Sequence, residues 1–143
     1  MGRERGYDAE FVSKGNAMIE RIETPEAPLP GGHYSQATKA NGFVFVAGQL
    51  PFIPGTERRM AEGIQAQAEQ CLRNVDAILR AAGSSRQRIV SVQLFIADVA
   101  LWGQVNTVYE AFMGDARPAR TVVPTRELHY DALIEINAIA VCD

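Results

Sequence analysis

The sequence is poor in the residues that build disulfide frameworks and metal centres. Among its 143 residues there are only two cysteines and two histidines. Cys71 and Cys142 lie far apart and show no metal-like clustering, so we expect two free thiols. His33 and His129 are also distant from each other and have no acidic cluster beside them. We therefore expect no metal centre, and we expect Cys71 to be a core residue and not a nucleophile.

Long hydrophobic runs and an excess of one charge are also missing. No apolar run approaches the roughly 20 residues that a membrane span needs, and no apolar signal core follows the N-terminus. The formal charge is −3 with both signs interleaved, which does not favour nucleic acid as a partner. Neither a dinucleotide-binding glycine motif nor a P-loop occurs. We expect a cytoplasmic protein that uses no cofactor.

The length and composition predict one folded domain. A chain of 143 residues that is 47% hydrophobic can bury a sizeable core but is too short for two ordinary domains. Residues 1–17 are polar and lack periodicity, so we interpret them as an N-terminal arm. Residues 18–143 form the expected domain.

Hydrophobic spacing predicts six strands and two helices. Apolar residues recur at helical spacing from Ile64 onward until Gly83, a typical helix-ending residue. The pair Asn41-Gly42 predicts a hairpin turn. In the strand at 89–96, alternation places Val90 on one face with Val92, Leu94 and Ile96. The expected strands are 18–22, 36–40, 43–50, 89–96, 120–124 and 133–141, and the expected helices are 64–82 and 101–113. This order predicts an α+β fold with two helices packed on one face of a mixed sheet.

Two segments have the character of a site edge. Pro25, Pro28 and Pro30 make a rigid loop that leads into Tyr34 and a hydroxyl residue. Gly48 stands at the end of a strand, where glycine often marks the close approach of a ligand or another backbone.

The last predicted strand carries two polar residues within an almost wholly apolar segment. Alternate side chains of a strand share a face, so Glu135 and Asn137 interrupt one apolar face together. A carboxylate there loses water and needs a partner, for which Arg120 is the obvious upstream candidate. A hairpin between the last two strands would place Arg120 opposite Asn137 and within diagonal reach of Glu135.

Two interpretations of Arg120 and Glu135 remain open from spacing alone. The two residues form a structural ion pair, or their face is open to solvent. Alternatively, they line a pocket in which the guanidinium binds a substrate carboxylate and the acid acts as a base on water. The second interpretation requires that burial raise the pKa of Glu135 toward neutrality.

Several motifs in their order along the chain resemble the RidA family of reactive intermediate deaminases, also called the YjgF family or L-PSP endoribonucleases. The similarity covers most of residues 25–141. It rests on Tyr34-Ser35-Gln36-Ala37, residues 43–51, Gln67 with Gln70, Leu72 and Asn74, Val105-Asn106 with Tyr109, Pro118-Ala119-Arg120, and Ile134-Glu135-Ile136.

The resemblance implies a fold, an assembly and a reaction. The fold is chorismate-mutase-like, and the assembly is a homotrimer with three ligand sites in the clefts between subunits. Family members hydrolyse 2-imino acids, released by pyridoxal-phosphate enzymes from serine or threonine, to 2-keto acids and ammonia without a cofactor.

The same resemblance assigns a role to each site residue. Arg120 would bind the substrate carboxylate and Glu135 would position or activate the attacking water. Tyr34 would line the cleft, while the remaining site residues would shape the cleft or donate backbone hydrogen bonds; these are Gly48, Asn106 and Val122.

Four differences from the usual family pattern leave the substrate open. Val122 replaces a common cysteine, His33 a common proline, and Asn137 a glutamate found in many members. The segment 114–117 is also shorter. Two other functions remain alternatives: a non-enzymatic protein that binds small carboxylates or takes part in stress-linked interactions, and an endoribonuclease, for which the sequence offers no paired histidines and no basic groove.

Overall fold

The computed structural model describes residues 19–143, so the predicted arm at 1–17 and Met18 lie outside the described residues. Six strands form one sheet in the order β1-β2-β3-β6-β4-β5. Neighbouring strands are antiparallel except β4 and β5, which are parallel, so the sheet is mixed as predicted. The strand bounds are β1 (Glu20–Ile22), β2 (Ala37–Ala40), β3 (Phe43–Gln49), β4 (Ile89–Ile96), β5 (Ala119–Pro124) and β6 (Ile134–Val141).

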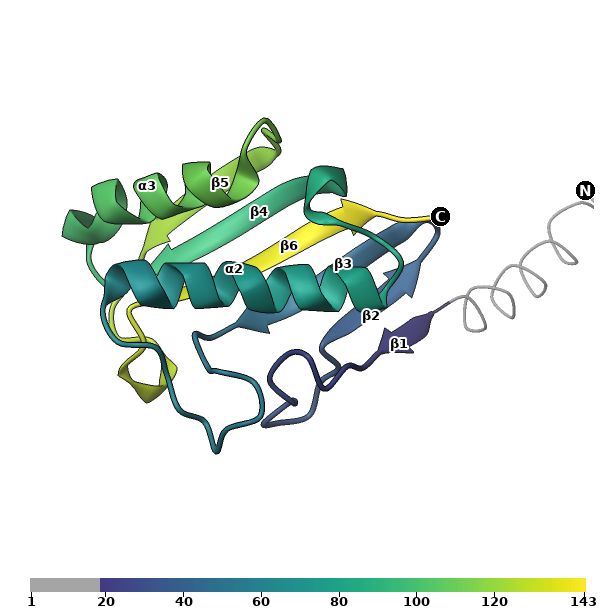
Figure 1. Cartoon of the computed structure of the whole chain (residues 1–143), viewed down its shortest axis with the longest axis horizontal. Coiled ribbons are helices and arrows are strands. Elements are labelled where there is room, and N and C mark those ends of the chain that lie inside the picture. Colours follow the sequence, from purple (N-terminus) through teal and green to yellow (C-terminus); the bar gives the residue numbers. More distant parts are fainter. Residues whose placement is uncertain (1–18) are drawn as a thin grey trace, which may run out of the picture.

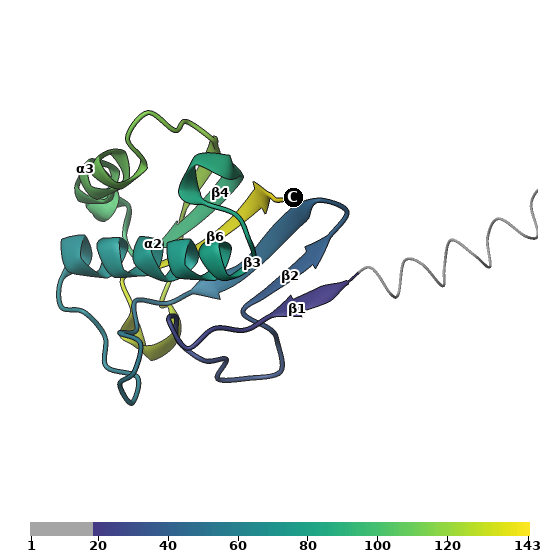
Figure 2. The ribbon, with the colours of Figure 1, turned by 45° about the vertical axis from the view of Figure 1, so that its right-hand side comes forward.

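Two helices, α2 (Ile64–Ala81) and α3 (Trp102–Met113), cover one face of this sheet (Figures 1 and 2). Their apolar sides and the inward side chains of the central strands form a single core. Gly83 follows α2 in a left-handed conformation with φ of 80°, as predicted for the helix end. Within residues 19–143 no helix has the length and apolar character needed to cross a membrane.

The hairpin of β2 and β3 has the predicted turn. Asn41 and Gly42 both have positive φ angles, 49° and 81°, which is the requirement of a type I′ turn. The register pairs Ala40 with Phe43 across this turn. A local sequence signal therefore determines this part of the sheet.

The predicted hairpin of the last two strands is wrong. β5 lies at the edge of the sheet and pairs with β4 in parallel, and β4 separates it from β6. Arg120 pairs with Val92, and Glu135 pairs with Phe95. Arg120 and Glu135 are consequently not cross-strand neighbours. The chain between β5 and β6 passes through a short 3₁₀ helix, η3 (His129–Asp131), instead of a tight turn.

The prediction for Val90 is also wrong. The pairing of β4 with β6 shifts between Ile89 and Ser91, which marks a bulge. Val92, Leu94 and Ile96 point into the core as expected, whereas Val90 is 41% exposed. A bulge adds one residue to the strand, so side chains on its two sides no longer follow the simple alternation between faces that the sequence predicts.

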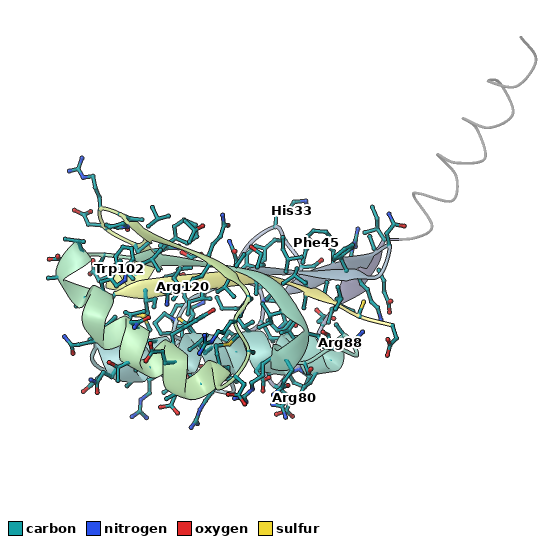
Figure 3. All side chains as sticks on the ribbon, turned by 90° about the horizontal axis from the view of Figure 1, so that it is seen from above. His33, Phe45, Arg80, Arg88, Trp102 and Arg120 are labelled. Atoms are coloured by element: carbon teal, nitrogen blue, oxygen red, sulfur yellow. The ribbon has the colours of Figure 1, made fainter. Side chains whose placement is uncertain are left out.

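The face of the sheet opposite the helices is called the open face below. It carries the alternate residues of β6, namely Glu135, Asn137, Ile139 and Val141, which are all partly exposed. Phe43 and Phe45 of β3 pair with Val141 and Ile139 on the same face. Figure 3 shows Phe45 on the side of the sheet away from both helices.

Candidate active site in two halves

The predicted site residues fall into two groups on opposite faces of the sheet. Arg120 and Val122 pair with Val92 and Leu94, whose side chains are buried under the helices, so both point to the helical face. Glu135 alternates with the buried Ile134 and Ile136 and therefore points to the open face. The sheet itself separates the two groups within one chain.

Arg120 is held by two residues of α3. Its Nη1 donates a hydrogen bond of 2.8 Å to Asn106 Oδ1, and its Cζ lies 4.9 Å from the centre of the Tyr109 ring. The Asn106 amide in turn donates from Nδ2 to Glu110 Oε1 at 3.1 Å. A cation above an aromatic face is attracted to the ring, so Tyr109 and Asn106 together fix the guanidinium. Tyr109 is thus part of the site. The sequence marked it only as one of the motif residues that carry the family resemblance, and no role was predicted for it.

The Tyr109 hydroxyl is the one buried side-chain polar atom without a hydrogen-bond partner among the described residues. Burial raises the pKa of this hydroxyl, and the positive charge of Arg120 opposes that rise. The hydroxyl is neutral under ordinary conditions, so Tyr109 supports Arg120 through its ring.

No carboxylate of residues 19–143 forms an ion pair with Arg120. Its guanidinium is exposed, and only one of its five N–H donors is used by Asn106. The interpretation of Arg120 and Glu135 as a structural ion pair within one chain therefore fails. The cation remains available to an external anion.

Glu135 lies at the beginning of β6 with its carboxylate over Gly48. A methyl group at Gly48 would overlap the Glu135 carboxyl group, so only glycine leaves room for this arrangement. Gly48 therefore marks the close approach of a side chain, where its place at the strand end suggested a ligand or another backbone. Burial raises the pKa of the Glu135 carboxyl, and the nearby His129 opposes that rise. A carboxylate with a raised pKa is a better base than a fully solvated one.

Tyr34 lies at the end of the proline-rich loop and lines a cavity together with His129 and with Gln49, the residue that follows Gly48. It is 53% exposed, and its hydroxyl accepts a hydrogen bond of 3.3 Å from the Gly31 backbone. The fully buried Gln36 side chain holds the base of the loop through bonds to the Thr24, Ala27 and Pro28 backbone. His33 is exposed at the edge of the molecule (Figure 3).

Buried polar residues of α2 hold the other loops of this half. Asn74 donates to the Leu50 and Phe52 carbonyls at 3.2 and 2.9 Å. Gln67 Oε1 accepts from the backbone N–H of Leu133 at 2.8 Å, just before β6. The sequence signal for such residues is an amide on the apolar side of a helix, since a buried amide must find partners.

The remaining candidates take no direct part in either group. Asn137 pairs with Gln93 on the open face. Cys71 is buried on the helical side, where burial and the charge of Glu135 both raise its pKa, so the thiol is poorly suited to nucleophilic chemistry. Within residues 19–143 no three His, Cys, Asp or Glu side chains gather as a metal site.

Comparisons with known proteins agree with this architecture. A family model described as Endoribonuclease L-PSP matches residues 24–142. The chain is 42% identical over 125 residues to a RutC family protein of Aquifex aeolicus, covering 86% of this chain and 99% of that one. It is 37% identical over 129 residues to the chloroplastic Reactive Intermediate Deaminase A of Arabidopsis thaliana, covering 90% and 69% of the two chains.

The solved structures point the same way. The crystal structure of TdcF from E. coli with bound serine matches with a TM-score of 0.83 and 36% identity over 87% of this chain and 99% of that one. The two helices on a mixed six-stranded sheet are the chorismate-mutase-like arrangement of these relatives. On both sequence and structure, the chain belongs to the RidA family, also known as the YjgF or L-PSP family.

Proposed function

We propose that this protein hydrolyses 2-imino acids to 2-keto acids and ammonia, in a site completed between copies of the chain in a homotrimer. The main observation behind the proposal is that the Arg120 guanidinium is held in place but has no carboxylate partner among the described residues. This guanidinium is fixed by Asn106 and Tyr109, yet it contacts no carboxylate of the described chain. A fixed and exposed guanidinium is suited to bind a substrate carboxylate with two parallel hydrogen bonds.

Glu135 supplies the base in this proposal. An imine carbon is electrophilic, so water adds to it when a base removes the water proton. Glu135 takes that proton as the C–O bond forms, and the proton then passes to nitrogen. The hydroxyl proton of the resulting tetrahedral intermediate then passes through Glu135 to nitrogen. The intermediate collapses as the C=O bond forms and the C–N bond breaks, which releases the keto acid and ammonia. Because burial raises its pKa, the Glu135 carboxyl accepts a proton more readily than a fully solvated one and can then return it to nitrogen.

The other family residues complete the cleft. Tyr34 lines one wall, and Gly48 leaves space for the Glu135 carboxylate. Val122 lies two residues beyond Arg120 on the same face of β5, where its backbone would bind the substrate. No group in this scheme requires a covalent nucleophile or a metal ion, because orientation alone supplies a large part of the rate.

The position of the two halves supports a site shared between chains, as in the proposed homotrimer. Arg120 and Glu135 act on the same small molecule only if they come from different chains, because the sheet lies between them within one chain. Phe43 and Phe45 on the open face are 40% and 44% exposed, and exposed aromatic residues on a sheet face favour association. A head-to-tail ring of three copies would place the β5 edge of one chain against the open face of the next.

Two relatives support the substrate class by their names. One is called Reactive Intermediate Deaminase A, and another was solved with bound serine. Serine carries the same α-carboxylate that Arg120 would bind in an imino acid derived from it.

The test is the release of keto acid from a 2-imino acid generated freshly from alanine by an amino-acid oxidase. We expect Arg120→Ala to lose at least roughly 100-fold in kcat/KM, whereas the exposed Arg73→Ala control retains the wild-type rate. Undiminished activity of Arg120→Ala would remove Arg120 from the mechanism.

Glu135→Gln separates a hydrolase from a protein that only binds small carboxylates. In a hydrolase this variant still binds pyruvate but loses turnover. If the wild type binds pyruvate and shows no turnover above buffer, the binding protein is the correct interpretation.

A further inference from the structure

A large cavity lies next to the Glu135 half of the site, and apart from Tyr34 its lining residues have no part in the mechanism above. Its volume is about 710 Å³. The walls come from three loops: the proline-rich segment 25–34, the segment 49–58 after β3, and residues His129 and Tyr130 of η3. These loops gather at the end of the sheet where β3 ends and β6 begins (Figures 1 and 2).

The cavity is much larger than a small imino acid needs. Pockets of about 300–1,000 Å³ enclose ligands of drug size, whereas an imino acid derived from alanine or serine would leave most of this space to water. The walls are mainly apolar, with prolines, Leu29, Leu50 and Ile53 among them. An apolar cavity of this size favours a ligand with a substantial apolar part.

Four aromatic side chains line the cavity: Tyr34, Phe52, His129 and Tyr130. The Phe52 and Tyr130 rings meet edge to face, with centres 5.1 Å apart. The His129 and Tyr130 rings are 4.0 Å apart. Clusters of this kind accept a further ring in stacked or edge-to-face contact, which adds to the gain from burial.

Arg58 connects the three loops at the cavity. Its Nη1 donates a hydrogen bond to the Tyr130 hydroxyl, and its Cζ lies 5.5 Å from the centre of the Tyr130 ring. A methyl group at Gly31 would come within 2.7 Å of Arg58 Nη2, so the guanidinium also lies against the proline-rich loop. Among residues 19–143 no carboxylate forms an ion pair with Arg58, although Glu57 also lines the cavity.

The residues that shape this corner hold strained backbone conformations. Arg58, Tyr130 and Asp131 have φ angles of 56°, 61° and 58° and are not glycines. Such conformations are unfavourable for residues other than glycine and persist where the surrounding structure fixes them. Here they direct Arg58 and Tyr130 into the same cavity.

The cavity adjoins the reacting groups. Gln49 lines it, and the preceding residue, Gly48, lies directly against the Glu135 carboxylate. Tyr34 belongs to both the cavity wall and the proposed cleft. A substrate whose imine carbon lies at Glu135 can therefore extend its side chain into the cavity.

We propose that the cavity receives the side chain of the substrate and selects 2-imino acids that carry an aromatic ring, with Tyr130 and Arg58 as specificity-determining residues. The ring of the substrate stacks against Tyr130, which Arg58 holds in place. This inference rests on the proposed function for its chemistry, while the binding preference can be measured without turnover.

The binding experiment compares phenylpyruvate with pyruvate by titration calorimetry. We expect wild-type protein to bind phenylpyruvate with a Kd at least tenfold lower. Tyr130→Ala and Arg58→Ala should reduce the ratio of the pyruvate Kd to the phenylpyruvate Kd to below about threefold without weakening the binding of pyruvate. The control Arg73→Ala should leave this ratio unchanged. Tyr130→Phe keeps the aromatic ring, so it should retain most of the preference for phenylpyruvate. That result would exclude misfolding as the cause of the lost preference in Tyr130→Ala.

The kinetic experiment uses imino acids generated by an amino-acid oxidase from phenylalanine or alanine. The expected result is a higher kcat/KM for the phenylalanine-derived imine, lost in Tyr130→Ala with the alanine-derived rate retained. Hydrolysis of both imines at equal rates, with equal affinity for both keto acids, overturns the cavity assignment while the proposed function stands. A preference for phenylpyruvate without hydrolysis of either imine overturns the proposed function while the cavity assignment stands.

Discussion

At the scale of single residues, Glu135 is the group whose environment matters most. It is half-buried over Gly48, and burial raises its pKa while His129 opposes the rise. The other titratable group coupled to it is Cys71, across the sheet, which stays protonated because its own pKa is raised. Glu135 is therefore the group expected to control the pH dependence of the reaction.

The first prediction concerns this pH dependence. Glu135 must be ionised to act as a base, so kcat/KM should rise with pH through a pKa above the ordinary 4.5. His129→Gln removes the electrostatic contribution that lowers the pKa of Glu135, so the acid limb of the profile should move to higher pH. The measurement is the pH profile with the alanine-derived imine, and His33→Gln is the matched control. A limb that moves to lower pH in His129→Gln would contradict the assignment.

The second prediction concerns Gly48. An added methyl group forces the Glu135 carboxylate to rotate away, because the two would overlap. We expect Gly48→Ala to lower kcat/KM by at least about tenfold with little change in the melting temperature, since misplacing a reacting group costs rate more than stability. Gly103→Ala is the control, because a methyl group there meets nothing. Equal activity of both variants would show that the carboxylate position is irrelevant.

At the scale of elements, the sequence predicts what depends on neighbours in the chain. The β2–β3 turn follows from Asn41-Gly42, and α2 follows from the spacing of its apolar residues, because both signals are local. The place of β5 is different: whether it pairs with β4 or β6 depends on contacts between distant segments. No local pattern distinguishes the two, so the predicted contact of Arg120 with Glu135 failed.

The same limit applies to the site. Spacing alone singled out Arg120 and Glu135 as candidate partners and Gly48 as a candidate for close approach, because a polar residue or a glycine in an apolar strand is visible in the sequence. The roles of Tyr109 and Arg58 depend on which helix or loop lies beside them. Those contacts became visible only in the fold.

The third prediction concerns the link between α2 and the cavity loop. Asn74 is 1% exposed and donates to the Leu50 and Phe52 carbonyls. Asn74→Ala leaves both without these donors, which should lower the free energy of unfolding by about 1–3 kcal/mol. Urea unfolding measures this loss, and hydrogen exchange should rise in residues 50–60. The exposed Gln65→Ala is the control, and a similar loss in both variants would contradict the proposed anchor.

At the scale of the whole molecule, the two faces of the sheet have different tasks. The helices cover one face and complete the core, whereas the open face presents Phe43 and Phe45 beside Ile139 and Val141. The Glu135 carboxylate lies on that same face. Association through the open face would therefore bury apolar surface and bring a second chain toward Glu135.

The fourth prediction tests this association. We expect wild-type protein to sediment as a trimer and Phe45→Glu to sediment as single chains, because a charge on the open face loses its water in the assembly. Ala66→Glu places the same charge on the exposed side of α2 and should remain trimeric. Wild-type protein that sediments as single chains would contradict the shared site.

The most direct test of the central claim is complementation between two inactive variants. Arg120→Ala and Glu135→Gln are each expected to be inactive as pure proteins. If every site takes Arg120 from one chain and Glu135 from its neighbour, random equal mixing by co-refolding leaves one site in four with both residues, so the mixture should regain about one quarter of wild-type imine hydrolysis. A mixture as inactive as either variant alone would show that the two residues do not meet between chains.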